Sequence, residues 1–261
     1  MKAHLTMPTD VITVPCLSDN YAFVIGNTDT NMATVVDVPE AAPINAVLAA
    51  QGWTVETVLL THHHDDHVMG LGALTGAADA VIVGAAADAH RLPPLTRAVA
   101  EGETVTASGH EVQVLDVSGH TNGHFAYYIP AIGHAFTADS LMALGCGRLF
   151  EGTAAQMWQS LRKLRALPDA TMICSGHEYT QSNARFAVTI DPENTHLTSR
   201  VAAIDAARRA GRPTVPSELS LEKQTNPFLR ADDPQIKAHL QMGDATDAAV
   251  FAEIRARKDK F

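Results

Sequence analysis

The sequence is poor in several features that would each define a class of protein. It has only three cysteines, Cys16, Cys146 and Cys174, and their spacing is not that of a zinc ribbon. Such a sparse, odd-numbered set excludes a disulfide framework and is typical of a reducing compartment. No apolar run approaches the roughly 20 residues of a membrane span, and the N-terminus lacks the apolar core of a signal peptide. We therefore expect a cytoplasmic protein with no membrane association.

Basic residues are also scarce. The 19 Lys and Arg residues face 29 Asp and Glu residues, and the formal net charge is -10. Nucleic acids and anionic membranes bind proteins through basic surfaces, so the charge disfavours both as partners. An anionic substrate would need a local cluster of basic side chains.

The pattern of apolar residues predicts an alternation of strands and helices over the first two thirds of the chain. Strands are expected at 11–14, 22–26, 33–37, 55–60, 80–83, 112–117, 125–129, 135–139 and 171–174. Helices are expected at 43–51, near 71–74, over an Ala-rich stretch that ends at His90, and at 154–167. The first two strands should form a hairpin around the polar turn at 18–20.

Beyond His177 the strand signals largely vanish. Helical runs at 180–188, 196–210 and 247–258 alternate with Pro and Gly breakers. With 261 residues, 46% of them hydrophobic, the chain can form one large domain with an appendage. We predict a first domain over residues 1–177 and a small helical domain over residues 178–261.

The most informative stretch runs from Thr61 to His67 and carries four imidazoles and two carboxylates in seven residues. It follows a buried strand, so we expect a loop at the strand's carboxyl end. In an extended segment, His62 and His64 point to the same side. Asp66 and His67 can then serve a second point nearby. Imidazole with carboxylate suits zinc, manganese or iron, and paired metals can activate water.

Further candidate ligands follow other predicted strands. They are Asp37, His120, Asp139 and His177. Taken singly, Asp139 could cap a helix and His177 could be a buried, hydrogen-bonded histidine. Their joint occurrence at strand ends favours a common edge of a sheet where several side chains meet.

Together these motifs resemble the metallo-β-lactamase superfamily, and more closely the glyoxalase II, or hydroxyacylglutathione hydrolase, family. The segments that carry the resemblance are Thr61–His67, Gly119–Thr121, Ala138–Asp139, Cys146–Thr153, Ser175–Thr180 and Thr225–Arg230. The resemblance implies an α/β fold, a four-layer αββα sandwich with a small C-terminal helical domain that binds glutathione. It extends from the first hairpin to the last residues.

The resemblance implies a site for two divalent metal ions, most simply zinc, with iron or manganese as alternatives. His62, His64 and His120 would hold one ion, and Asp66, His67 and His177 the other, with Asp139 bridging them. Asp66 would also orient the metal-bound hydroxide that attacks the substrate. Asp37 and His124 would orient ligand imidazoles through the far ring nitrogen.

The implied reaction is hydrolysis of S-2-hydroxyacylglutathione thioesters, such as S-lactoylglutathione, to glutathione and a hydroxy acid. This is the second step of methylglyoxal detoxification. The implied substrate contacts are Arg148, Phe150, Tyr179, Arg255 and Lys258. Three positions depart from the common family pattern, since Asp65, Arg148 and Phe150 stand where tryptophan, lysine and tyrosine are frequent. We expect a monomer with a small-molecule substrate.

Three other functions fit parts of the sequence. A persulfide dioxygenase of the same superfamily would use one iron, whereas this chain has seven candidate ligands and the segment 226–230. A non-catalytic metal- or glutathione-binding protein would have lost ligands. An RNA-processing nuclease is disfavoured by the acidic charge.

Overall fold

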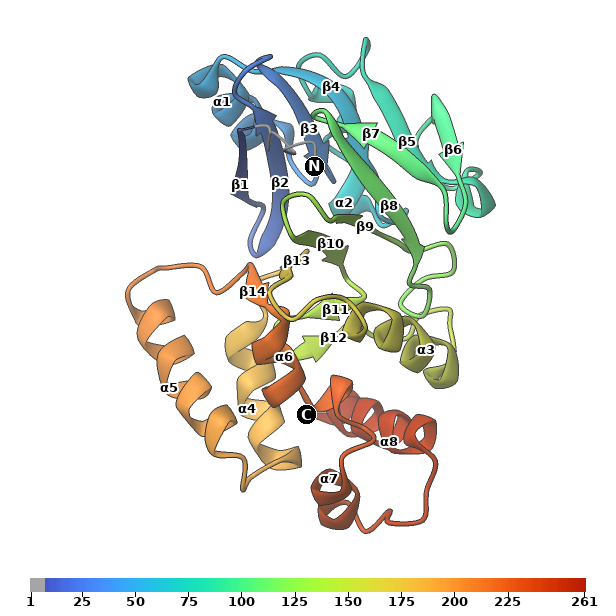
Figure 1. The fold of residues 1–261 in the computed structure, drawn as a ribbon, viewed down its shortest axis with the longest axis vertical. Helices are drawn as coiled ribbons and strands as arrows, with labels where there is room; N and C mark the ends of the chain where they lie inside the picture. Colours follow the sequence, from blue (N-terminus) through green and yellow to red (C-terminus); the bar gives the residue numbers. More distant parts are fainter. Residues whose placement is uncertain (1–7) are drawn as a thin grey trace, which may run out of the picture. The chain divides into compact units, whose positions relative to one another are not determined.

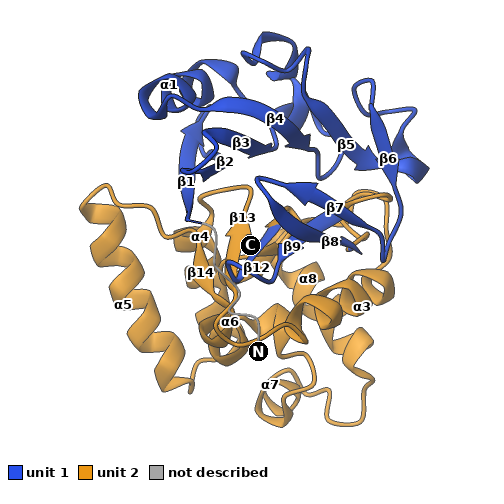
Figure 2. Ribbon diagram, turned by 45° about the horizontal axis from the view of Figure 1, so that its top comes forward, with its two compact units in different colours: residues 1–116, 125–136 blue, residues 117–124, 137–261 orange. Residues whose placement is uncertain are grey.

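The computed structural model describes residues 8–261. The N-terminus, for which the sequence predicts no signal peptide, lies largely outside these residues. The chain forms two compact units (Figure 2). The first unit contains the described residues up to Asp116 together with Phe125–Phe136, and the second contains Val117–His124 and Thr137–Phe261. The domain boundary after residue 177 stays a prediction.

The first unit contains a six-stranded sheet in the order β1-β2-β3-β4-β5-β6 (Figure 1). Its strands are β1 (Thr9–Cys16), β2 (Asn20–Asn27), β3 (Met32–Val36), β4 (Thr54–Leu59), β5 (Val81–Ala85) and β6 (Arg97–Val99). The first three strands pair antiparallel, and the remaining pairs are parallel. The predicted hairpin and the next three strands are confirmed.

Helix α1 (Ala41–Gln51) makes the crossover that parallel pairing of β3 and β4 requires. It buries Ile44 and Leu48 and ends at Gly52, whose φ of 68° lies in the left-handed region. Glycine is favoured at such a helix end because it has no Cβ to clash. The predicted end of this helix is confirmed.

The first unit also contains an antiparallel set of strands, β7 (Thr104–Ala107), β8 (His110–Asp116), β9 (Phe125–Ile129) and the first three residues of β10 (His134–Ala138). Buried side chains join this set to the first sheet. The Phe136 and Phe23 rings pack edge to face at 5.4 Å, and the Tyr127 hydroxyl donates to the Leu60 carbonyl at 2.8 Å. These contacts fix the strand end that precedes Thr61.

The second unit contains the last residues of β10, strands β13 (Met172–Ser175) and β14 (Ser217–Glu218), and a small hairpin of β11 (Leu141–Met142) and β12 (Gly145–Cys146). Its helices are α3 (Ala154–Arg165), α4 (Thr180–Ile190), α5 (Thr195–Arg209), α6 (Leu219–Thr225), α7 (Pro234–His239) and α8 (Asp247–Lys260) (Figure 1). One apolar cluster packs α4 and α5 around Leu144, with Ala184, Ala187, Leu197 and Ile204.

The Ala-rich stretch before His90 is not the helix that its composition predicts. Strand β5 continues to Ala85 because it pairs with β6, and only a 3-10 turn, Ala86–Asp88, follows. Asp88 is buried there and accepts hydrogen bonds from side chains, so tertiary contacts override helix propensity. The short strands β6, β7, β11, β12 and β14 have too few residues for a periodic signal. The predicted α/β fold class is confirmed.

Within the described residues, none of the helices combines the length and the apolar character needed to cross a membrane.

Candidate metal and substrate site

In the first unit, two parallel strand ends bring Asp37 to the histidine run. Strands β3 and β4 end at Val36 and Leu59, and the Asp37 N–H donates to the Leu59 carbonyl at 3.0 Å. Asp37 has a φ of 56°, which is uncommon for a residue with a side chain, and its carboxylate accepts from the Thr61 N–H and hydroxyl. The carboxylate therefore lies beside the segment that follows β4.

The histidine run is partly an irregular segment and partly helical. His62, His63 and His64 precede α2 (Asp65–Val68), a single turn that carries Asp66 and His67. The prediction of a loop is therefore only partly right, since acidic residues at a helix start favour that turn. His62 Nε2 and His64 Nδ1 approach to 3.1 Å, as expected from their alternation. His63 turns elsewhere, and its Nδ1 lies 2.9 Å from Asp88 Oδ2.

The Asp37 carboxylate organises this run. Its oxygens accept from the Thr61 N–H and the Thr61 hydroxyl, each at 2.8 Å, and from His67 Nδ1 at 2.8 Å. Because the carboxylate only accepts, His67 carries its proton on Nδ1, and in the neutral ring Nε2 offers a lone pair. His62 Nδ1 lies 3.0 Å from the Thr61 hydroxyl oxygen, which its N–H can reach in the same way.

Asp66 and His67 present their donor atoms together. Asp66 Oδ2 lies 3.9 Å from His67 Nε2. The Asn20 side chain donates at 3.0 Å to both the main-chain carbonyl and Oδ2 of Asp66, which fixes the direction of the carboxylate. Asn20 was not identified from the sequence, where it looked only like a turn residue.

In the second unit, Asp139 lies between two histidines at adjoining strand ends. The Gly176 N–H donates to the Ala138 carbonyl at 3.0 Å, which holds the ends of β13 and β10 together. Asp139 Oδ2 is 3.5 Å from His120 Nε2 and 3.4 Å from His177 Nε2. Asp139 caps none of the helices in the described residues, whereas His177 is buried beside a carboxylate, as its alternative interpretation expects.

The tautomer of His120 is set by the main chain. Its Nδ1 lies 2.8 Å from the Arg148 carbonyl oxygen, which can only accept, so Nδ1 carries the proton. In the neutral ring, the Nε2 lone pair then faces the Asp139 carboxylate. His124 is buried, with its ring centroid 6.1 Å from that of His120.

These donor sets fit divalent cations. In the first unit the His67 Nε2 lone pair lies 3.9 Å from Asp66 Oδ2, and in the second the His120 Nε2 lone pair lies 3.5 Å from Asp139 Oδ2. Electron-rich atoms in this arrangement repel unless a cation or a proton lies between them, and neutral imidazole with carboxylate is a common donor set for zinc and iron. The cysteines do not join them. Burial raises the pKa of the Cys16 and Cys146 thiols to about 11.

A second feature of the second unit is a cluster of cations around α8. Arg255 is buried, donates to the Cys146 carbonyl at 2.9 Å and lies over the Phe228 ring at 5.2 Å. Burial, together with the charges of Arg255 and Arg148, lowers the pKa of Lys258 from 10.5 to about 8. An anion that binds beside Lys258 would stabilise its charged form, so this position favours an anionic ligand.

Two exposed aromatic rings cover the second-unit histidines. Tyr179 stacks on His177 with centroids 4.6 Å apart, and Phe150 meets the His120 ring edge to face at 5.2 Å. Their exposed fractions, 40% and 63%, are large for aromatic residues. Rings in this position can contact a ligand that reaches the histidines.

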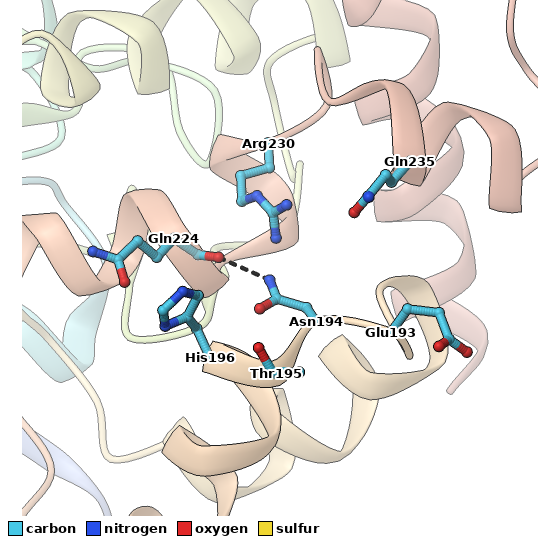
Figure 3. Close-up of a pocket in the computed structure, with 7 residues that line it drawn as sticks. All are labelled: Glu193, Asn194, Thr195, His196, Gln224, Arg230 and Gln235. Atoms are coloured by element: carbon cyan, nitrogen blue, oxygen red, sulfur yellow. Dashed lines mark hydrogen bonds between the residues drawn. The ribbon is translucent and has the colours of Figure 1, made fainter.

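The second unit also has a surface pocket at the N-terminus of α5 (Figure 3). It is lined by Glu193, Asn194, Thr195, His196, Gln224, Arg230 and Gln235. Arg230 is already ion-paired with Asp191 and Asp233, and the pocket includes none of the predicted site residues. It therefore has no part in the site described above.

Comparison with known proteins identifies the class first. The model of the metallo-β-lactamase superfamily matches residues 20–177, and the chain belongs to this superfamily. The model of the hydroxyacylglutathione hydrolase C-terminus matches residues 178–261. A hydroxyacylglutathione hydrolase of Ruegeria pomeroyi is 62% identical over 98% of this chain and 100% of the relative. One of Cereibacter sphaeroides is 60% identical over the same shares. The chain belongs to the hydroxyacylglutathione hydrolase family.

A solved structure shows the same fold at low sequence identity. ETHE1 from Myxococcus xanthus has a TM-score of 0.64 and 24% identity, covering 96% of this chain and 90% of that chain. At this identity the similarity concerns the fold alone.

Asp139 provides a direct test of the ligand assignment. Asp139→Ala removes the carboxylate between His120 and His177, so bound metal should fall to less than half of the wild-type content. His63→Ala should leave metal content unchanged and cost about 1 kcal/mol of stability through the lost bond to Asp88. Elemental analysis of both purified proteins measures the difference, and equal metal loss in the two variants would refute the assignment.

Proposed function

We propose that this protein is a metal-dependent hydrolase of S-2-hydroxyacylglutathione thioesters such as S-lactoylglutathione. The names of its relatives and the match of both family models support the activity. The single structural observation that carries it is the pairing, within the second unit, of metal-type donors with a cation cluster linked through the segment 146–148. Hydrolysis of the thioester needs the metal-type donors, and binding of the anionic tripeptide needs the cations.

We propose two divalent metal ions. His62, His64 and His120 would hold one, and Asp66, His67 and His177 the other, with Asp139 shared. When bound, such ions polarise a carbonyl oxygen and lower the pKa of water to about 7. Zinc is the expected metal, and the same donors accept iron or manganese.

The chain's own residues then orient the reactants. Asp66, held by Asn20, would accept a hydrogen bond from the attacking water and direct it at the thioester carbon. The C–O bond forms as the carbonyl π bond opens, and the proton of the water passes to Asp66 and on to solvent. When the carbonyl re-forms, the C–S bond breaks and glutathione departs as a thiolate, which is a good leaving group. Asp37 and the Arg148 carbonyl would keep His67 and His120 in the neutral tautomer that can bind metal. No protein nucleophile is required.

Glutathione would be bound by its peptide part. We propose that Arg255 and Lys258 bind the glycine carboxylate and that Arg148 and Tyr179 contact the peptide. Phe150 would offer only its ring. In an acidic protein, this cluster is the local basic surface that an anionic substrate needs.

Turnover with defined substrates tests the proposal as a whole. Metal-loaded enzyme should release glutathione from S-lactoylglutathione, detected with a thiol reagent, and lose the activity after chelation. The persulfide dioxygenase alternative predicts oxygen consumption with glutathione persulfide instead. Cleavage of unrelated thioesters or a lactam, with S-lactoylglutathione intact, would refute the substrate assignment.

The lowered pKa of Lys258 predicts a pH dependence. Because this pKa is about 8 and not 10.5, the ammonium loses its proton as pH rises through 8 and its attraction for the carboxylate is lost. Wild-type kcat/KM should fall by up to about tenfold between pH 7.5 and 9.5. Lys258→Arg stays charged and should flatten the decline.

Lys223→Arg is the matched control for this measurement, because Lys223 pairs with Asp169 away from the cluster. It should keep the wild-type profile. If Lys258→Arg also keeps the wild-type decline, another group causes it.

Replacement of Phe150 by tyrosine should raise the affinity for the substrate. Phe150→Tyr restores a hydroxyl donor at an exposed ring, worth roughly 0.5 to 1.5 kcal/mol if it meets the substrate. KM for S-lactoylglutathione should fall by about two- to tenfold with metal content unchanged. An unaltered KM would show that the hydroxyl does not reach the peptide.

A further inference from the structure

The hairpin of β11 and β12 has its turn held by buried side chains from elsewhere in the second unit. Asn226 donates from Nδ2 to the carbonyls of Met142 and Gly145, each at 3.1 Å. Glu222 accepts from the Leu144 N–H at 2.9 Å. Leu144 has a φ of 55°, so the turn adopts a conformation that its own residue does not favour. Outside side chains stabilise it.

Helix α4 supplies a third side chain that bonds to the turn. Asn183 donates from Nδ2 to the Ala143 carbonyl at 3.1 Å, so polar groups of four consecutive residues, 142–145, bond to side chains. Asn226 also donates to Glu222 at 3.1 Å. Asn226 and Glu222 are both 0% exposed. Buried polar groups cost stability unless they are bonded, so this network specifies one position of the hairpin.

The hairpin leads directly into both parts of the proposed site. The carbonyl of Cys146, its last residue, accepts from Arg255 at 2.9 Å. Two residues later, the carbonyl of Arg148 accepts from His120 Nδ1 at 2.8 Å. Gly147 lies between them, where an added Cβ would stand 2.0 Å from the Asp139 carbonyl oxygen. The segment after the hairpin thus has almost no freedom to move independently.

The segment is also bonded to the loop that carries His120. The Phe150 N–H donates to the His120 carbonyl at 3.1 Å, and the Gly152 N–H donates to the Gly119 carbonyl at 3.1 Å. A displacement of the hairpin would therefore move the acceptor of His120 and the acceptor of Arg255 together.

We infer that Asn226 is a positioning residue for both parts of the proposed site, the metal ligand His120 and the substrate-binding Arg255. By fixing the hairpin it places the Cys146 carbonyl, which orients Arg255, and the Arg148 carbonyl, which orients His120. The Arg255 part rests on the proposed function, whereas the His120 part rests on the histidine's role as a metal ligand. Asn226 touches neither metal nor substrate.

The test uses Asn226→Ala in cobalt-loaded protein. The variant should alter the visible absorption bands of cobalt(II), weaken metal retention against a chelator by about 10- to 100-fold, and raise KM for S-lactoylglutathione several-fold. Asn183→Ala, which loses a single bond to the turn, should shift the same quantities in the same direction by less. If Asn226→Ala does not fold, Asn183→Ala allows the same comparison with wild-type protein.

Asn194→Ala is the matched control. Asn194 also bonds a main-chain carbonyl, that of Gln224 at 2.8 Å (Figure 3), and it caps α5, and neither bond goes to the hairpin. It should lower the melting temperature and leave the cobalt spectrum and KM at wild-type values. That contrast separates positioning from general loss of stability.

Two results would overturn the inference. If Asn226→Ala and Asn183→Ala lower only the melting temperature, as the control does, Asn226 has a structural role alone. If KM rises while the cobalt spectrum is unchanged, the link to His120 is wrong. Wild-type protein that binds cobalt but leaves S-lactoylglutathione intact would refute the proposed function, while the spectral comparison would still test the link to His120.

Discussion

The site depends on one constraint, which is that a histidine can bind a metal only through a nitrogen that carries no proton. Each ring must therefore carry its proton on the other nitrogen, and a hydrogen-bond acceptor placed there favours that tautomer. Asp37 provides this acceptor for His67, and the Arg148 carbonyl provides it for His120. Much of the local structure, including the unusual backbone angle of Asp37, serves to put these acceptors in place.

The same constraint explains why main-chain position matters as much as side-chain identity. A main-chain carbonyl does not depend on the side chain of its residue, so only the fold can position it. Arg148 bonds His120 through its peptide oxygen, and the proposed function gives its guanidinium a separate contact with the substrate. The hairpin that precedes it is fixed by Glu222, Asn226 and Asn183, which are far from it in the sequence.

Electrostatics shows a similar division between overall and local properties. The chain as a whole is acidic, but burial and the neighbouring charges of Arg255 and Arg148 lower the pKa of Lys258. Asp259 pairs with Arg255 at 2.8 Å, and an anion bound at Lys258 would stabilise the charged form of that lysine. The net charge disfavours partners that need a broad basic surface, whereas this cluster supports the small anionic ligand proposed above.

The sequence by itself determined the strand and helix order, the histidine run and the other candidate ligands, because apolar periodicity and metal-type spacing are local patterns. It also carried the resemblance from which the family follows. It could not reveal Asn20, the Arg148 carbonyl or the role of Asn226, since hydrogen bonds between distant segments leave no periodic signal. The Ala-rich stretch before His90 was misjudged for the same reason, because pairing with β6 and the buried Asp88 outweigh alanine's helix preference. Only the tertiary structure decided which nitrogen each histidine presents, because the deciding acceptors for His67 and His120 lie 30 and 28 residues away.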